Sequence, residues 1–291
     1  MSAPPAARLP ISAVLITRNA GAQLDACLRS VDFCAEVVVV DSGSEDDTLA
    51  VAARHGARVF HEAWRGFGPM KQFAVDQATN DWVLCVDADE RIGETLRRSI
   101  HAAFAAVPPG LTFSPAGGTD KPPPGLTLGP AGGTDKPPPG PAFKAWRFAR
   151  CNRFMGRYLR HGEGYPDWSL RLFDRRHARW SDDAVHEKVL TDAPVGTLAG
   201  DLLHDTAETL ESYLAKQNRY TTLAAGLAVA AGRRAGLFHL LFSPLVRFVK
   251  FYCLRLGALD GLPGLVHILI GCQNSFAKYA KMIDLQRRNS Q

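Results

Sequence analysis

The stretch WVLCVDADER, residues 82–91, passes without a break from apolar to acidic side chains. Its apolar run predicts a buried strand, and Asp87, Asp89 and Glu90 follow that strand directly. Residues two apart on a strand point to the same face, so Asp87 and Asp89 are expected to share one side. Glu90 is expected to point the other way and to start the next helix. Either these carboxylates solvate a loop and cap a helix, or two of them hold a metal ion.

Strand-like and helix-like segments alternate on both sides of this stretch. Apolar runs predict strands at 11–19, 36–42, 57–62 and 82–89, and helical spacing of apolar residues predicts helices at 22–31, 44–56, 69–79 and 93–107. Such alternation predicts βαβ units and a parallel sheet. Ligands bind at the carboxyl ends of the strands in sheets of this kind. Asp41 and the Asp87/Asp89 pair lie at such ends.

Two regions interrupt or follow this pattern. The 15-residue units 110–124 and 125–139 are nearly identical and rich in Pro and Gly, which predicts an extended surface insertion at 108–141. From residue 205 the pattern is helical, and neither 237–261 nor 262–283 has the roughly 20 uninterrupted apolar residues of a spanning helix. Their mixture of apolar, aromatic and basic residues predicts peripheral contact with an anionic membrane. The alternative is packing on the catalytic part or on a second subunit.

Composition and charge narrow the class of protein. Hydrophobic residues make up 46% and charged residues 22% of the chain, as in folded soluble proteins. The first 142 residues carry 12 basic and 16 acidic side chains, whereas residues 205–291 carry 11 and 5. A basic second half suits phosphorylated ligands or anionic lipid, or is simply a solvated face. The six cysteines lack CxxC spacing and predict buried free thiols, and residues 1–10 contain no apolar core that would indicate export.

The spacing of the acids indicates a chemistry. Two carboxylates placed as close as Asp87 and Asp89 repel each other unless a cation lies between them. Carboxylates are hard oxygen ligands that suit Mg²⁺ or Mn²⁺, and such a metal can neutralise a diphosphate leaving group. Asp41, which follows the run VVVV, can accept hydrogen bonds from a base or a ribose. The alternative role is a helix cap, which fits Ser44 better than Asp41.

At this point ISAVLITRN, EVVVVDSGSEDDT, DWVLCVDADER, RHGEGYPDWSLRLFDRR and VHEKV together resemble the family 2 glycosyltransferases. More narrowly, the chain is similar to the bacterial branch that adds glucose to the inner core of lipopolysaccharide. The resemblance implies a GT-A fold, an α/β Rossmann-like mixed sheet flanked by helices, with a helical C-terminal appendage. Residues 1–107 would bind the nucleotide sugar, 142–204 would bind the acceptor, and 205–291 would form the appendage.

The resemblance also implies roles for individual residues. The donor would be contacted by Thr17, Asn19, Asp41, Ser42, Lys71, Asp87, Arg160 and His161. Asp87, Asp89 and His186 would hold Mg²⁺ or Mn²⁺. The first strand is followed by Arg18-Asn19-Ala20-Gly21 where the family usually has a Lys-Asn-Glu-Glu type of turn, so acidic contacts expected there are absent.

An inverting displacement needs one general base to take the proton of the acceptor hydroxyl. Glu187 in VHEKV is the first candidate and Asp167 in YPDWSLRLF is the second. The alternatives are a salt bridge for Glu187 and a turn after Pro166 for Asp167. Bidentate phosphate binding suits a set of basic residues, some of which will be plain surface charges: Arg153, Arg157, Arg160, His161 and Arg171.

The expected function is therefore the inverting, metal-dependent transfer of a hexose, glucose, from a UDP-sugar to a lipopolysaccharide-core or related glycolipid. The expected location is the cytoplasmic face of a bacterial inner membrane. The alternatives are a non-catalytic nucleotide-sugar-binding protein and a glycosyltransferase with a polysaccharide or protein acceptor. A dinucleotide-binding enzyme is not expected, because no GxGxxG follows the first strand and there is no Walker A motif. The basic residues match no nucleic-acid-binding motif.

Overall fold

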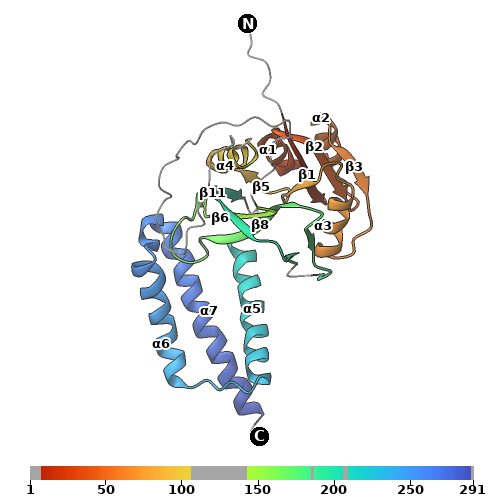
Figure 1. Ribbon diagram of the computed structural model, residues 1–291. Helices are drawn as coiled ribbons and strands as arrows, with labels where there is room; N and C mark the ends of the chain where they lie inside the picture. Colours follow the sequence, from red (N-terminus) through yellow and green to blue (C-terminus); the bar gives the residue numbers. More distant parts are fainter. Residues whose placement is uncertain (1–7, 106–142, 185–186, 206–208, 290–291) are drawn as a thin grey trace.

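A mixed β-sheet with helices on both faces forms the upper part of the molecule in Figure 1, and three long helices project from it. The computed structural model describes residues 8–105, 143–184, 187–205 and 209–289. The strands are β1 (Leu9–Thr17), β2 (Cys34–Asp41), β3 (Arg58–His61), β4 (Trp82–Cys85), β5 (Glu90–Ile92), β6 (Ala145–Phe154), β7 (Arg157–Tyr158), β8 (Asp167–Asp174), β9 (Ala178–Trp180), β10 (Val189–Thr191) and β11 (Val195–His204). The helices are α1 (Gly21–Ser30), α2 (Thr48–Arg54), α3 (Phe67–Asp76), α4 (Glu94–Phe104), α5 (Leu210–Ala230), α6 (Leu237–Phe248), the π-helical η1 (Val249–Leu254), the 3₁₀-helical η2 (Gly257–Asp260) and α7 (Gly261–Arg288).

The sheet has the strand order β3-β2-β1-β4-β8-β6-β11-β5, and β7 pairs with β6. β1 to β4 are mutually parallel where they pair, as the alternation of strands and helices predicts. β8 is antiparallel to its neighbours β4 and β6, whereas β11 returns parallel to β6 and pairs antiparallel with β5. The predicted α/β fold with a mixed sheet, flanking helices and a helical C-terminal region is confirmed.

Alternating side chains bury both faces of the central strands. In β4, Leu84 faces the layer formed by α1, α2 and α4, whereas Val83 faces the layer formed by α3. Both side chains are fully buried, and each such burial contributes about 1.5–3 kcal/mol. A strand that is apolar on both faces in this way is typical of a parallel sheet covered on both sides.

The strand register brings the carboxyl ends of three strands to one edge. Thr17 at the end of β1 pairs with Asp41 at the end of β2. β4 pairs with β1 up to Cys85, opposite Val14, and therefore ends just short of them. Asp87 and its neighbours consequently emerge beside the ends of β1 and β2.

The second half of the sheet completes this edge from more than a hundred residues away in the sequence. At the end of β11, His204 pairs with Asn152 of β6 on one side and with Glu90 of β5 on the other. The pairing of β11 with β6 is irregular between Thr197 and Asp201, and Gly200 there has φ +98°. A Cβ atom at Gly200 would lie 2.3 Å from the backbone nitrogen of Leu96 at the start of α4, so this close approach requires glycine.

Two local features differ from the sequence-based expectations. The helix predicted at 44–56 begins only at Thr48, because the Asp46 carboxylate accepts hydrogen bonds from the backbone N–H of Thr48 and of Gly21. The loop before α2 is thereby tied to the start of α1. The strand predicted at 82–89 ends at Cys85, because the chain turns at residues 88–89 and enters β5 at Glu90.

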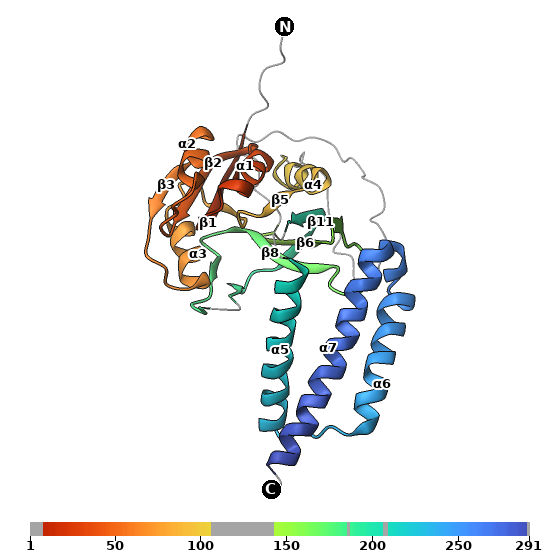
Figure 2. The ribbon, with the colours of Figure 1, turned by 180° about the vertical axis from the view of Figure 1, so that it is seen from behind.

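Three long helices make up the C-terminal region. Figures 1 and 2 show α7 between α5 and α6, with the α5–α6 connection and the C-terminus at the end farthest from the sheet. Polar contacts join the helices on their inner sides, among them Ser243 Oγ to Ser275 Oγ at 2.7 Å and Asn274 Nδ2 to Gln217 Oε1 at 2.9 Å. The outer side of α6 is apolar and exposed, with Leu237, Phe238, Leu241, Phe242, Leu245 and Val246 each about half or more exposed.

Within the described residues, one helical segment, Leu237–Leu254, is long and apolar enough to cross a membrane by length and composition. Its mean hydropathy is 1.4 over 18 residues, and none of it is buried. Arg247 and Lys250 interrupt it, as expected, yet its average falls in the spanning range. The thiols also differ in part from expectation. All six cysteines are free and four are buried, but Cys253 is exposed and Cys272 is partly exposed. The insertion predicted at 108–141 lies outside the described residues.

Candidate active site

The carboxylate of Asp41 closes the turn that follows β2. It accepts hydrogen bonds from the backbone N–H of Gly43 and of Ser44, both at 2.9 Å, from Ser44 Oγ at 2.5 Å and from Thr17 Oγ1 at 3.2 Å. Burial would raise the pKa of Asp41, but these hydrogen bonds outweigh it and hold the pKa below its usual value. Asp41 is 1% exposed, so in this structure it shapes the loop that follows β2 at the carboxyl edge of the sheet. Ser44 is its partner and not the cap of α2.

Asn19 and Ser42 belong to the same loop system. Asn19 has φ +51°, donates its backbone N–H to Ser44 Oγ at 2.8 Å and accepts from the Glu45 N–H at 2.8 Å. Asn19 thus joins the end of β1 to the loop after β2. The hydroxyl oxygen of Ser42 is buried and has no hydrogen-bond partner among the described residues. An unsatisfied polar atom of this kind next to a loop is a candidate contact for a ligand.

Asp87 lies between two buried cations. Lys71 Nζ is 3.1 Å from Asp87 Oδ1, and Arg171 Nη2 is 3.0 Å from Asp87 Oδ2. Burial would raise the pKa of Asp87, but Arg171 and Lys71 outweigh it and hold that pKa well below its usual range. Arg171 Nη1 is buried without a hydrogen-bond partner among the described residues, so part of its donor capacity is unused.

Glu90 faces the same charged cluster as Asp87. The expectation that it points away and starts the next helix is wrong, because Glu90 opens β5 and pairs there with His204. Its carboxylate is fully buried, accepts the Asp87 N–H at 2.9 Å and lies 3.5 Å from Arg171 Nη2. Burial raises the pKa of Glu90, and the attraction of Arg171 offsets this only in part. Glu90 therefore stabilises the turn of the acidic stretch from its buried side.

Asp89 faces a histidine that sequence reasoning missed. Asp89 Oδ2 lies 3.2 Å from His204 Nε2, and His204 Nδ1 lies 2.7 Å from Asn152 Oδ1. In the tautomer in which His204 Nδ1–H donates to the amide oxygen of Asn152, Nε2 carries no proton. Its lone pair then faces Asp89 and is available to a metal ion. The available signal was the apolar run that ends at His204, which predicts a strand end. Only the pairing of β11 with β5 and β6 places that strand end here.

Glu187 reaches the site through Lys71. Its Oε1 lies 2.8 Å from Lys71 Nζ, and the same ammonium contacts Asp87. Lys71 is 6% exposed and lies 4.9 Å from the centre of the Trp180 ring, which packs over it. The structure thus brings Lys71, Asp87 and Glu187 together. His186 lies outside the described residues.

Asp167 lies at the same edge but in a different arrangement. It begins β8, which runs antiparallel to β4, so its end of the strand faces the acidic turn. Arg150 Nη2 is 2.7 Å from Asp167 Oδ2, and Arg150 Nη1 is 3.7 Å from Glu90 Oε1. Asp167 is therefore joined to the buried cluster through a bridging arginine.

Other predicted phosphate-binding residues lie elsewhere. Arg160 pairs with Asp201 at 3.0 Å, and His161 Nδ1 contacts Asp260 Oδ1 of η2 at 3.0 Å. Arg157 donates to the Leu259 carbonyl oxygen at 3.0 Å. Arg160 thus contacts β11, whereas His161 and Arg157 contact η2 in the C-terminal region. None of the three lines the cavity that holds Asp87 and Asp89.

That cavity has a volume of about 440 Å³ and opens at the carboxyl edge of the sheet. It is lined by Ile16, Thr17, Arg18, Trp64, Phe67, Asp87, Asp89 and His204. The rings of Trp64 and Phe67 contact each other edge to face at 4.8 Å, and both side chains are more than 40% exposed. An acidic floor with an aromatic wall suits a ligand that has a charged part and a flat part.

The donor atoms of three residues in this cavity suit a divalent cation by their chemistry. Asp87 and Asp89 offer carboxylate oxygens and His204 offers an imidazole nitrogen, a donor set that Mn²⁺ accepts. Within the described residues, these side chains are not drawn together as a cluster of three metal-ligating groups. Asp87 is turned to Lys71 and Arg171, and only Asp89 and His204 touch directly.

Comparisons with known proteins agree with this geometry. Residues 12–103 match the sequence profile of Glycosyl transferase family 2. The chain is 29% identical over 282 residues to the lipopolysaccharide core biosynthesis glycosyltransferase LpsC of Rhizobium meliloti. This match covers 94% of the chain and 92% of LpsC. An uncharacterized glycosyltransferase of Rickettsia felis is 42% identical over 97 residues, which are 33% of the chain and 34% of that protein.

Solved structures match a smaller part. Glucosyl-3-phosphoglycerate synthase of Mycobacterium tuberculosis, in complex with Mn²⁺, uridine diphosphate and glucosyl-3-phosphoglycerate, matches with 26% identity and a TM-score of 0.28. That match covers 32% of the chain and 38% of the solved structure. The chain thus spans well under half the length of that protein.

Proposed function

We propose that the chain, whose residues 12–103 match the profile of Glycosyl transferase family 2, is a glycosyltransferase of that family and transfers glucose from a UDP-sugar to a glycolipid with inversion of configuration. One observation carries this proposal. Asp87 and Asp89 from the turn after β4 and His204 from the end of β11 line one cavity at the carboxyl edge of the sheet. This is where ligands bind in open α/β sheets.

The donor site needs charge neutralisation for a leaving diphosphate. Asp89, His204 and Asp87 would hold Mg²⁺ or Mn²⁺, which acts as a Lewis acid when bound. Lys71 and Arg171 lie behind Asp87, are nearly buried and hold it ionised. The Trp64 ring at the mouth of the cavity offers a flat surface to the nucleobase. Ser42 and Asp41 belong to the loop beside this cavity and would support the donor from there.

The acceptor hydroxyl needs a base, and we assign this role to Glu187. Its carboxylate contacts Lys71 Nζ at 2.8 Å, and the same ammonium contacts Asp87, so Glu187 lies beside the donor cavity. Asp167 is the second candidate, and it contacts Arg150 at the same edge of the sheet. Glu187→Gln is expected to lower kcat by roughly 10²–10⁴-fold, the usual contribution of a general base. If Asp167→Asn lowers kcat more than Glu187→Gln does, Asp167 is the base and Glu187 is not.

The likeness to LpsC over most of both chains supports a lipopolysaccharide-core or related glycolipid acceptor. A lipid-linked acceptor is held at a membrane, and the C-terminal helices support such contact. The apolar residues of α6 face outward, whereas Ser243 and Arg247 face inward to Ser275 and Glu163. A helix that turns its polar side to the protein and its apolar side outward is suited to lipid.

We therefore propose that α6 contacts an anionic membrane, at the cytoplasmic face of the bacterial inner membrane. Basic side chains flank α6 on both sides in the sequence. Arg233 and Arg234 lie in the α5–α6 connection, Lys250 lies in η1 and Arg255 follows η1. The test is flotation of the full chain with vesicles of phosphatidylglycerol and phosphatidylcholine. Salt-sensitive binding that needs phosphatidylglycerol supports the proposal, and no binding at low salt contradicts it.

Activity is tested by incubating the full chain with a panel of UDP- and GDP-sugars and either Mg²⁺ or Mn²⁺, and measuring release of the nucleotide. We expect UDP-glucose to be hydrolysed slowly and only with the metal. Asp89→Ala should abolish this release. A chain that binds UDP-glucose but shows the same release as Asp89→Ala, also with acceptor present, would instead be a nucleotide-sugar-binding protein.

A further inference from the structure

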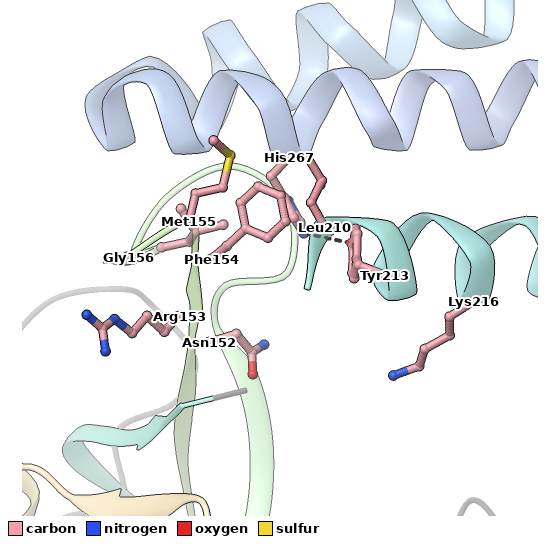
Figure 3. Close-up of a pocket in the computed structure, with 10 residues that line it drawn as sticks. Asn152, Arg153, Phe154, Met155, Gly156, Leu210, Tyr213, Lys216 and His267 are labelled. Carbon is pink, nitrogen blue, oxygen red and sulfur yellow. Dashed lines mark hydrogen bonds between the residues drawn. The ribbon is translucent and has the colours of Figure 1, made fainter. Parts of the chain in front are cut away.

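A second cavity of about 420 Å³ lies where the sheet meets the C-terminal helices, between the β6–β7 hairpin, α5 and α7 (Figure 3). It is lined by Asn152, Arg153, Phe154, Met155, Gly156, Leu159, Leu210, Tyr213, Lys216 and His267. Its residues therefore come from three separate elements that meet at this junction. The donor site described above does not include any of them.

The two cavities are separated by one pair of side chains. Asn152 lines the second cavity and His204 lines the first, and Asn152 Oδ1 lies 2.7 Å from His204 Nδ1. His204 in turn contacts Asp89. A molecule in the second cavity would thus lie next to the place where the sugar is transferred. An acceptor has to occupy a position of this kind relative to the donor.

The wall of the second cavity is aromatic. Phe154 from β6 contacts Tyr213 of α5 and His267 of α7, with ring centres 5.4 and 5.2 Å apart. Tyr213 Oη and His267 Nε2 lie 3.3 Å apart. Burial and the nearby Arg247 lower the pKa of His267, so its ring is neutral near pH 7. Figure 3 shows the three rings gathered on one side of the cavity. Flat apolar rings with polar edges suit the C–H face of a sugar.

The charged groups of this cavity are positive. Of its ten lining residues, Lys216 and Arg153 are cationic, and none is acidic. Figure 3 shows the Lys216 side chain extending from α5 to the side on which Asn152 lies. Arg153 also lies 3.5 Å from Asp205, next to the acidic turn. An ammonium group in the lining of an aromatic cavity favours an anionic group on the ligand.

The rim of the cavity is apolar on the side of the helices. Met155 is 52% exposed and Leu210 is 43% exposed, and both line the cavity. Leu214, one turn further along α5, is 37% exposed. An alkyl chain that leaves the cavity would therefore run along apolar surface toward α5 and the other helices. The cavity and its rim together suit an amphiphile with a charged saccharide head.

We propose that this cavity is the acceptor subsite, and that it holds a saccharide carrying a phosphate or a carboxylate, with the anionic group at Lys216 and the ring on Phe154, Tyr213 and His267. The proposal rests on the transferase function above and names its substrate class. A sugar of this kind on a lipid anchor would be placed with its hydroxyl toward Asp89 across the Asn152–His204 pair.

Binding is measured by calorimetry on the full chain in detergent, with glucose 6-phosphate, glucuronate, methyl glucoside and glycerol 1-phosphate as probes. We expect the first two to bind at least about tenfold more tightly than methyl glucoside, because a hydrogen bond to a charged group is lost with the latter. They should also bind more tightly than glycerol 1-phosphate, which lacks the ring. Equal binding of glycerol 1-phosphate would mean a phosphate or lipid-headgroup site and would overturn the saccharide assignment.

Variants locate the binding. Lys216→Ala should weaken glucose 6-phosphate about tenfold or more and leave methyl glucoside unchanged. Tyr213→Ala should weaken both sugars but not glycerol 1-phosphate. Arg219→Ala is the matched control, because Arg219 lies on the same helix and is exposed. Probes that do not bind, or that bind equally to Lys216→Ala and Arg219→Ala, overturn the proposal.

Kinetics separate this proposal from the proposed function. Lys216→Ala should raise the KM for a detergent-dispersed anionic glycolipid and leave UDP-glucose hydrolysis and UDP binding unchanged. If the wild-type chain hydrolyses UDP-glucose while Lys216→Ala leaves the KM for the acceptor unchanged, the subsite is wrong and the transferase function stands. If the wild-type chain releases no nucleotide and transfers no sugar, the proposed function itself fails.

Discussion

Lys71 is the residue on which the charge balance of the site depends. It is nearly buried and contacts both Asp87 and Glu187. Lys71→Met leaves two carboxylates without this partner, and removal of one member of a buried ion pair costs about 3–5 kcal/mol. We expect a loss at the lower end of that range, because Arg171 still faces Asp87. Urea unfolding measures it.

The control for that experiment is Lys188→Met. Lys188 follows Glu187 in the sequence and is exposed, so its replacement should change the free energy of unfolding by less than about 0.5 kcal/mol. Equal effects of the two substitutions would show that the contacts of Lys71 contribute nothing to stability.

Asp41 predicts a pH dependence. Its pKa in the folded chain lies below the unperturbed value of 3.8, so its hydrogen bonds stabilise the fold above that pH and are lost as the pH falls through the folded value. Asp41→Ala should therefore lower the free energy of unfolding by about 1–3 kcal/mol at neutral pH. The difference between wild type and variant should shrink below pH 3.8. Unfolding curves at neutral and acidic pH measure it, and a difference that stays constant contradicts this account.

At the scale of residues, the sequence predicted the position of a side chain where that position depends on neighbours in the chain. Asp87 and Asp89 follow an apolar strand, so their place at the carboxyl edge was predictable. Their separation into an ion-paired Asp87 and a histidine-facing Asp89 was not, because Arg171 and His204 come from strands about 80 and 115 residues away. The structure likewise turns Asp41 to its own loop.

At the scale of elements, Gly200 sets how closely β11 approaches α4. Gly200→Ala would place a Cβ 2.3 Å from the Leu96 nitrogen and would also require a positive φ. We expect a loss of more than about 2 kcal/mol, since strain and overpacking add. His204 lies at the end of the same strand, so UDP binding should weaken as well.

Gly232→Ala is the matched control for this glycine. Gly232 also has a positive φ, but a Cβ there would have nothing within 4 Å. Thermal unfolding of both variants should show the smaller decrease in melting temperature for Gly232→Ala. Its cost should be limited to the strain of one non-glycine residue at positive φ, about 1–2 kcal/mol. Similar shifts would contradict the view that β11 and α4 are held by close contact.

Apart from β5, the elements of the first hundred residues were predictable, because local apolar spacing defines them. The β5 strand was not, since three residues after a turn carry no pattern of their own and pair only with β11. The apolar side of α6 was visible as composition. Its outward direction follows only from the inward contacts of Ser243 and Arg247.

At the scale of the whole molecule, the proposed membrane contact of α6 leads to a test. If α6 contacts lipid, substituting Gln for both Leu241 and Leu245 should reduce flotation with phosphatidylglycerol vesicles about tenfold or more. Each substitution removes roughly 1–2 kcal/mol of apolar burial. Both side chains are more than half exposed, so the fold should keep its stability. Analytical ultracentrifugation of the same variants tests the alternative. A dimer lost together with unchanged flotation would assign this face to a second copy.

A metal-assisted nucleotide site built from Asp87, Asp89 and His204 is the centre of the proposed function. Calorimetric titration of UDP into the full chain, with Mn²⁺ and with EDTA, tests it most directly. We predict at least tenfold tighter binding with Mn²⁺ in the wild type, with this gain lost in Asp89→Asn and in His204→Ala and retained in the control Arg219→Ala. Metal-dependent binding of UDP that is as tight in Asp89→Asn as in the wild type would contradict the account.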